Sequence, residues 1–134
     1  MTARIGSARA AAHELARVAA QAADAKKAVD TLVLDVGDVL AITEAFVVTG
    51  ASNRRQVRTI AEAVEEEVKI LLDRSPVRTE GLADLQWVLL DYGDVVVHIF
   101  ADEPRRFYEI ERLYRDAPRI AWEPTSATKD AEAG

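Results

Sequence analysis

The chain has 134 residues, a formal net charge of −6 and no cysteine, and 49% of its residues are hydrophobic. This length favours one domain with enough apolar side chains to bury a core, and the missing cysteines exclude disulfide bonds, thiolate metal sites and thiol catalysis. The acidic balance argues against a surface that broadly neutralises phosphates, so no sequence-specific nucleic-acid partner is expected. No apolar run approaches the roughly 18 residues of a membrane helix and no apolar signal segment opens the chain, so we expect a soluble, cytoplasmic protein.

Alanine dominates residues 1–26. Because alanine is the best helix former, a helix is predicted from about Ser7 to Ala28, with Ser7 as its N-cap. Large apolar side chains are scarce on this helix, and Leu15 and Val18 supply most of the bulk on its apolar face. Such a helix is stable only when it docks on another element.

Two short apolar runs, residues 31–36 and 45–49, predict strands, and a long helix follows them. Ser52 or Asn53 caps this helix, and Gln56 stands three residues after Asn53, which is the spacing of a capping box. Apolar residues then recur at three- and four-residue steps and predict one buried helix face. They are Val57, Ile60, Ala61, Val64, Val68, Leu71 and Leu72.

A β-hairpin follows in the sequence. Residues 85–90 and 95–100 are apolar runs separated by a short turn that contains Gly93. The second run reads VVVHIF, which suits a central strand covered on both faces. A helix is expected next, because Asp102 can cap it and Pro104 suits its first turn.

The predicted order of elements is α-β-β-α-β-β-α. This order indicates an α/β fold with a mixed sheet and flanking helices. Residues 123–134 are small and polar and have no hydrophobic pattern, so we expect a disordered tail there.

The sequence contains no recognisable catalytic or metal-binding pattern. His13 and His98 are the two histidines, and they lie in different predicted elements without metal-ligand spacing. No serine stands in a nucleophile elbow, and no phosphate-binding glycine loop is present. Asp35 and Asp38 invite comparison with the acids of nucleotidyltransferases. Their spacing, and their position before the turn at residues 50–52, do not suit that chemistry.

Large aromatic and arginine side chains gather around the hairpin, as they do in interface hot spots. Side chains alternate along a strand, so Trp87, Leu89 and Asp91 point to one face and Tyr92 to the other. A face that carries Trp87, Asp91 and His98 mixes apolar bulk with polar groups, which is typical of a recognition surface. The alternative is that Trp87 and His98 belong to the core.

Three segments of the chain carry specific motifs. They are the hairpin string WVLLDYGDVVVHIF at residues 87–100 with its continuations Arg105-x-Phe107-Tyr108 and Glu111-x-Leu113, the string TEAFVVTGASNRRQVRTIAEAV at residues 43–64, and Asp116-Ala117-Pro118. Together these motifs resemble the ribosome silencing factor family, the Iojap-like proteins. Glu44 replaces the aspartate that is usual in the family. The resemblance divides the chain into an Ala-rich N-terminal helix (1–26), a silencing factor domain (27–122) and a tail (123–134).

This resemblance implies a fold related to nucleotidyltransferases but without their catalytic residues, and a protein with no enzymatic activity, cofactor or metal. It implies binding to the large ribosomal subunit through ribosomal protein fourteen of that subunit. The bound protein would sterically block association with the small subunit and so repress translation when nutrients are scarce. The family is also linked to maturation of the large subunit.

The motif positions predict which residues bind the partner. They are Trp87, Leu89, Asp91, Tyr92, Asp94, Val96 and His98, with Arg105 and Tyr108 as second choices. Two other functions stay open. One is a nucleotidyltransferase-like, nucleotide-binding enzyme that uses Asp35, Asp38 and Ser52. The other is a homodimerisation module, and a free silencing factor could itself form a homodimer.

Overall fold

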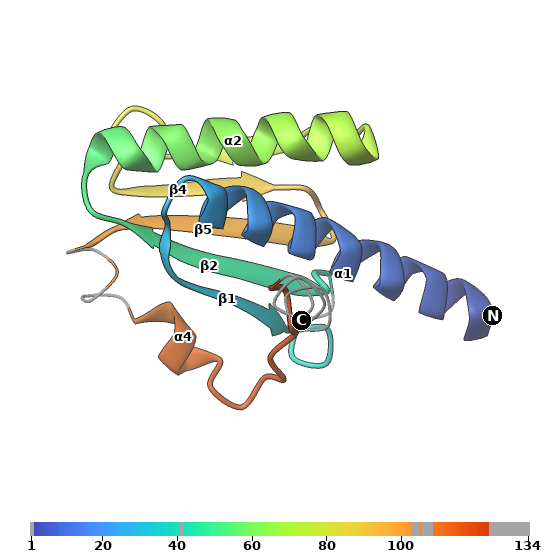
Figure 1. Ribbon diagram of the computed structural model, residues 1–134. Helices are drawn as coiled ribbons and strands as arrows, with labels where there is room; N and C mark the ends of the chain where they lie inside the picture. Colours follow the sequence, from blue (N-terminus) through green and yellow to red (C-terminus); the bar gives the residue numbers. More distant parts are fainter. Residues whose placement is uncertain (1, 41, 103–104, 106–108, 124–134) are drawn as a thin grey trace, which may run out of the picture.

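The computed structural model describes residues 2–40, 42–102, 105 and 109–123. Its elements are α1 (Thr2–Ala25), β1 (Val29–Asp35), β2 (Ala45–Ala51), α2 (Arg54–Leu72), β3 (Arg78–Glu80), β4 (Trp87–Asp91), β5 (Val95–Ala101) and α4 (Ile110–Leu113). The strands form a five-stranded sheet in the order β1-β2-β5-β4-β3. Strands β2 and β5 are parallel, and the other neighbouring pairs are antiparallel. The predicted α/β fold with a mixed sheet is therefore confirmed (Figure 1).

The predicted hairpin is present as strands β4 and β5, which pair in antiparallel fashion. Strand β5 lies between β2 and β4, and its residues from Val95 to Phe100 are all buried, as its continuous apolar character predicts. The three-residue edge strand β3 was not predicted, because its sequence Arg-Thr-Glu has no apolar alternation.

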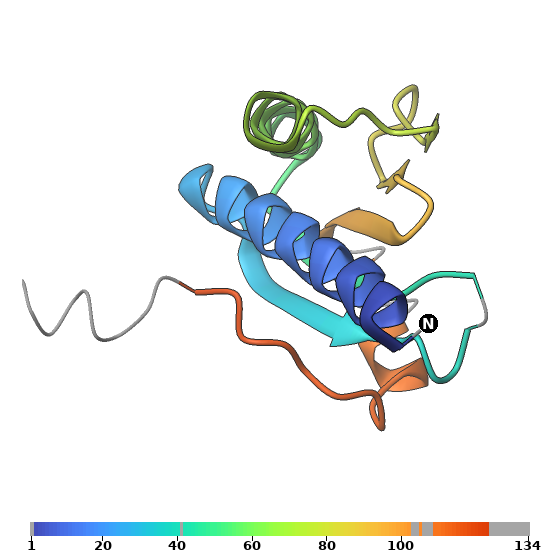
Figure 2. The same cartoon turned by 90° about the vertical axis from the view of Figure 1, so that its right-hand side faces the viewer.

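Helices α1 and α2 cover the same face of the sheet (Figures 1 and 2). The buried residues of α1 are mostly alanines: Ala12, Leu15, Ala16, Ala19, Ala20, Ala22 and Ala23. Their short side chains let the helix lie close to the sheet, and this packing provides the docking that the helix needs. The N-cap prediction at Ser7 is wrong, because α1 begins at Thr2 and Ser7 lies inside it. The sequence before Ser7 continues the helix instead of ending it.

The capping residues of α2 were predicted correctly. Asn53 is the N-cap, and its side-chain oxygen accepts a hydrogen bond from Gln56 N at 2.8 Å. The Gln56 side chain accepts in turn from Ser52 N at 2.7 Å and donates to Lys26 O and Lys27 O at 3.2 and 2.9 Å. One glutamine therefore closes the helix start and ties it to the segment that follows α1.

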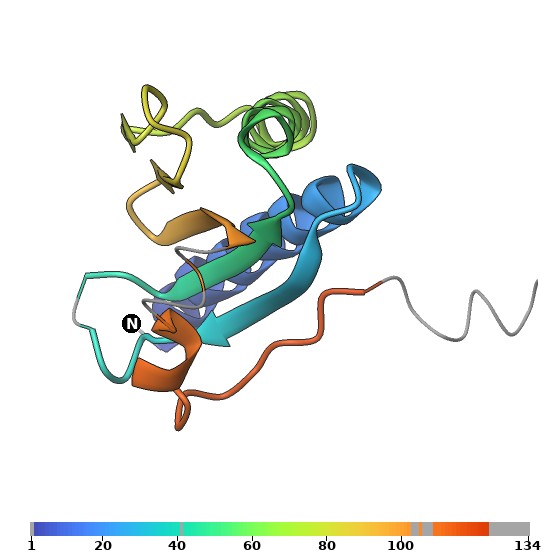
Figure 3. The ribbon, with the colours of Figure 1, turned by 90° about the vertical axis from the view of Figure 1, so that its left-hand side faces the viewer.

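Helix α4 lies on the opposite face of the sheet, and residues 115–123 run past the outer edge of β1 (Figures 2 and 3). Asp35 N donates to Pro118 O at 2.8 Å, and Ile120 N donates to Val33 O at 2.9 Å. The Trp122 indole N–H donates to Thr31 O at 3.1 Å. The free edge of β1 is therefore covered by a segment distant in sequence.

Some of the predictions fall on residues outside the described ranges. Pro104, the predicted first-turn residue of the last helix, lies there, and so do residues 124–134 of the predicted disordered tail. Within the described ranges, no helix is both long and apolar enough to cross a membrane.

Candidate functional site

The register of the hairpin brings six side chains onto one face of the sheet. Trp87 stands opposite Phe100, Leu89 opposite His98, and Asp91 opposite Val96. Because side chains alternate along strands, these six residues share a face, which we call the hairpin face. It is the face turned away from α1 and α2. The sequence placed Trp87, Asp91 and His98 on one face, and the register confirms this.

His98 lies at the buried centre of the hairpin face. Its side chain is 4% exposed, and Phe46 packs edge-on against the imidazole at a centroid distance of 4.7 Å. Burial lowers the pKa of His98 to about 4, although the nearby Asp91 carboxylate opposes this change. The imidazole is therefore neutral at physiological pH.

A hydrogen bond joins the two polar rings of the hairpin face. The Trp87 indole N–H donates to His98 Nδ1 at 3.2 Å. Since Nδ1 accepts, the ring proton of the neutral imidazole must be on Nε2. His98 Nε2 is buried and has no hydrogen-bond partner among the described residues.

Trp87 is partly exposed and held in place. Its indole stacks on Phe100 at a centroid distance of 4.8 Å, in addition to its hydrogen bond to His98. Leu89 and Asp91 on the same strand are also partly exposed, whereas Val96, His98 and Phe100 across the hairpin are buried. The accessible part of the hairpin face is thus an aromatic ring, an aliphatic side chain and a carboxylate in a row.

Tyr92 lies on the other side of the sheet. Its side chain is 2% exposed and belongs to the core beneath the helices, as the alternation along the strand requires. Its hydroxyl is buried without a hydrogen-bond partner among the described residues. Burial and then the nearby Glu65 carboxylate raise the pKa of Tyr92 well above its ordinary value. The structure therefore does not bring Tyr92 together with the hairpin face.

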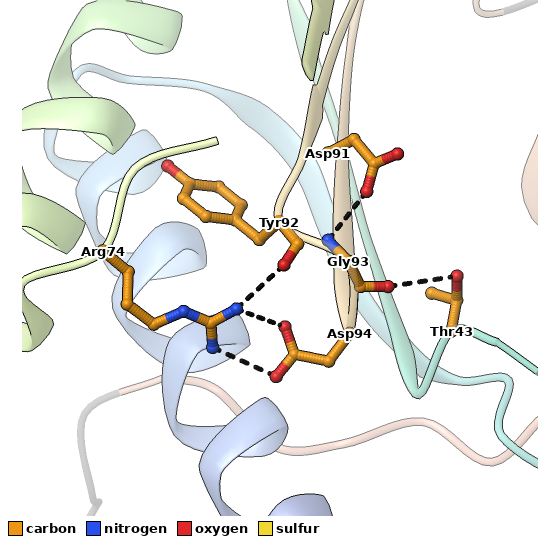
Figure 4. A network of polar contacts seen from close by, with 6 residues as sticks. All are labelled: Thr43, Arg74, Asp91, Tyr92, Gly93 and Asp94. Carbon is orange, nitrogen blue, oxygen red and sulfur yellow. Dashed lines mark hydrogen bonds and ion pairs between the residues drawn. The ribbon is translucent and has the colours of Figure 1, made fainter. Parts of the chain in front are cut away.

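Asp94 is engaged in a network at the hairpin turn (Figure 4). Its carboxylate accepts two hydrogen bonds from Arg74, at 2.7 and 3.1 Å, and Arg74 also donates to Tyr92 O at 2.8 Å. This pairing raises the pKa of Arg74. Gly93, whose φ is 92°, donates to Asp91 Oδ1 at 2.8 Å. Asp94 thus joins the chain after α2 to the turn. Apart from the arginine that follows α2, no local pattern predicts this contact.

Arg105 also has a structural role inside the chain. It is 9% exposed and donates to Val29 O at 3.0 Å and to Asp30 O at 2.6 Å. Gly50 lies beside it, where an added Cβ would be only 3.0 Å from Arg105 Nη1. The arginine therefore ties the segment after β5 to the start of β1. Tyr108, the other second choice, is outside the described residues.

The three residues of the enzyme alternative are not brought together. Asp35 pairs with Ala45 at the start of β2, whereas Ser52 follows Ala51 at the end of the same strand. At about 3.3 Å per residue, this separation is roughly 20 Å. Among the described residues no group of three or more histidine or acidic side chains is arranged to hold a metal ion.

Asp35 fastens α1 to the sheet instead. Its carboxylate pairs with Arg9, accepts from Gly37 N at 3.1 Å, and lies 3.6 Å from His13 Nε2. Burial acts to raise the pKa of Asp35, but the hydrogen bonds from Arg9 and Gly37, together with the positive charge of Arg9, outweigh it and leave the pKa below its ordinary value. The role of Arg9 could not be predicted from the sequence, because nothing local links it to a strand residue 26 positions away.

Several known proteins are similar to this chain in sequence and in fold. A family model described as "Ribosomal silencing factor during starvation" matches residues 9–134. The ribosomal silencing factor RsfS of Bacillus subtilis is 34% identical over 105 residues, which cover 76% of this chain and 86% of the relative. A crystal structure of a protein from Chromobacterium violaceum superposes with a TM-score of 0.72 at 29% identity, covering 85% of this chain and 93% of that one.

A mouse relative extends the comparison to organelles. It is named mitochondrial assembly of ribosomal large subunit protein 1 and is 29% identical over 87 residues, which cover 63% of this chain and 38% of the relative. The chain thus spans under half the length of this mitochondrial protein.

Proposed function

Because the chain belongs to the ribosomal silencing factor family, we propose that it binds the large ribosomal subunit through ribosomal protein fourteen and sterically blocks association with the small subunit. In this proposal it represses translation in the cytoplasm and catalyses no reaction. The name of the mouse relative supports a connection to the large subunit, and it also favours a second role in large-subunit maturation.

The observation that carries the proposal is the state of Trp87. Its ring is partly exposed, but Phe100 and His98 fix it from two sides. Large aromatic side chains of this kind dominate the binding energy of protein interfaces. A side chain already ordered in the free protein loses little conformational entropy on binding, so a pre-positioned indole is a favourable anchor.

The nine predicted partner-binding residues divide into groups in this proposal. Trp87, Leu89 and Asp91 contact the partner directly, because they are the exposed members of the hairpin face. Val96 and His98 support them from below. Tyr92, Asp94 and Arg105 act inside the chain, through the core or through their internal hydrogen bonds. Tyr108 keeps its proposed binding role without a structural assignment.

The charge of the chain supports a basic partner. A net charge of −6 attracts a basic protein and speeds its encounter, and Asp91 stands at the end of the exposed row. The same row of Trp87 and Leu89 could contact a second copy of the chain. We therefore include in the proposal a homodimer of the free protein that competes with ribosome binding.

Co-sedimentation of the purified protein with isolated large subunits, small subunits and joined ribosomes tests the proposal. Binding to free large subunits together with loss of subunit joining is the expected result. Purified ribosomal protein fourteen should compete for the binding. Sedimentation with small subunits only, or with no ribosomal particle, would refute the proposal.

A further inference from the structure

The hairpin face contains a histidine that the partner cannot reach. His98 is 4% exposed, while its neighbour across the hairpin, Leu89, and the adjacent Trp87 are partly exposed. A direct contact between His98 and a protein partner would require the side chains that cover it on this face to move aside. The side chain must therefore influence binding through a residue that lies between it and the surface.

Trp87 is that residue. Its indole N–H is the donor to His98 Nδ1 at 3.2 Å, and Phe100 stacks on its ring at 4.8 Å. Stacking alone fixes the plane of a ring but allows it to slide and turn within that plane. The hydrogen bond adds a constraint of a different kind, because it fixes the direction of the indole N–H.

The tautomer of His98 makes the constraint specific. An imidazole that carries its proton on Nδ1, or on both nitrogens, would present a donor to the donor of Trp87. Acceptance at Nδ1 requires a proton on Nε2. The apolar rings of Phe46 and Phe100 surround the imidazole, at centroid distances of 4.7 and 6.2 Å, and disfavour the charged form.

We infer that His98 is a positioning residue, which accepts the indole N–H of Trp87 at Nδ1 and so fixes the orientation in which Trp87 is presented to the protein partner. This inference rests on the proposed function for its consequence in binding. It differs from the sequence-based interpretation, in which His98 touches the partner itself.

The two tryptophans of the chain provide an internal control for the test. Trp122 also donates its indole N–H, to Thr31 O at 3.1 Å near the edge of β1. The indole N–H resonances of Trp87 and Trp122 can be followed separately by NMR. In the variant His98→Leu, hydrogen exchange of the Trp87 N–H should become about two- to tenfold faster, because the hydrogen bond to His98 is lost. The Trp122 resonance should not change.

Two variants distinguish positioning from mere packing. His98→Asn places an oxygen two bonds from Cβ, where Nδ1 stands in histidine, and should restore a protected Trp87 N–H. Affinity for purified large subunits should fall by about two- to tenfold in His98→Leu and recover in His98→Asn. In a Trp87→Phe background, which lacks the N–H, His98→Leu should cost no further affinity.

If His98→Leu fails to fold, the wild-type imidazole ¹⁵N spectrum still decides the inference. Nδ1 should be the unprotonated nitrogen, and its shift should move in Trp87→Phe. A protonated Nδ1, an unchanged Trp87 resonance in His98→Leu, or equal affinity loss in the Leu and Asn variants would overturn the inference. If wild-type protein binds no large subunit, the proposed function fails, while the resonances still report whether His98 orients Trp87.

Discussion

The two faces of the sheet are built from alternate residues of the same strands but differ in chemistry. The face under α1 and α2 is packed with aliphatic side chains and alanines, and Val47, Val97 and Ile99 on it are completely buried. The hairpin face carries aromatic rings, a histidine and a carboxylate, and part of it is exposed. The larger apolar core therefore lies on one side of the sheet, and the other side carries a smaller core together with the surface for which we propose recognition. Because side chains alternate along a strand, the position of a substituted residue indicates which of the two faces the substitution affects.

The largest effect should come from the helix-covered face. Ile60 of α2 is completely buried against the sheet, whereas Ile70 of the same helix is 66% exposed. Ile60→Ala should lower the free energy of unfolding by about 2–5 kcal/mol, and the matched control Ile70→Ala by less than about 0.5 kcal/mol. Urea unfolding at 25 °C measures both. Equal effects would show that α2 does not pack as described.

A decrease in pH should lower the free energy of unfolding through the protonation of His98. Its pKa is about 4 in the folded protein and about 6.5 when unfolded, so the unfolded chain binds more protons between these values. The stability that the neutral His98 side chain contributes is fully present above about pH 6.5, and it is lost as the pH decreases towards 4. Between pH 7 and pH 5 the loss should be about 2 kcal/mol. His98→Asn, which does not titrate, should lack this component, and parallel pH profiles of the two proteins would contradict the assignment.

Trp87→Ala should affect binding more than folding. Removal of a partly exposed hot-spot indole is expected to weaken binding to the large subunit by about 2 kcal/mol, or roughly thirtyfold. Far-UV circular dichroism and cooperative thermal unfolding should be retained. Wild-type affinity, or loss of the folded state, would show that Trp87 is part of the core and not an anchor.

The smallest effects should separate the two aspartates near the turn. Asp94 is paired with Arg74, so Asp94→Asn should reduce stability by about 1 kcal/mol or less and leave affinity unchanged. Asp91 ends the exposed row, so Asp91→Asn should slow association and weaken its salt dependence with little effect on stability. Stopped-flow association at two ionic strengths tests this difference. If Asp94→Asn slowed association and Asp91→Asn did not, the roles assigned to these two residues would be wrong.

Local periodicity explains what the sequence predicted well. The two-residue alternation in the hairpin placed Trp87, Asp91 and His98 on one face, and the capping pair Asn53 and Gln56 fixed the start of α2. Tyr92 was included among the binding residues because it belongs to the family motif, although the same alternation assigns it to the opposite face. The alternation is the better guide at that position.

Long-range polar contacts were beyond prediction. The bonds from Arg74 to Asp94, from Arg9 to Asp35 and from Arg105 to the backbone of β1 join residues 20, 26 and about 75 positions apart. No periodic pattern encodes such pairs, because each depends on where the packed elements end. The short strand β3 was missed for a related reason: its pairing with β4 comes from tertiary position and not from its own side chains.

The covering of the β1 edge by residues 118–122 has a consequence for biosynthesis. This segment is the last described part of the chain to leave the ribosome, and it lies against a strand made much earlier. While synthesis continues, the N–H and C=O groups on that edge of β1 have no partner, and such edges are prone to pair with other chains. This border of the sheet can therefore be completed only after residues 118–122 have left the ribosome.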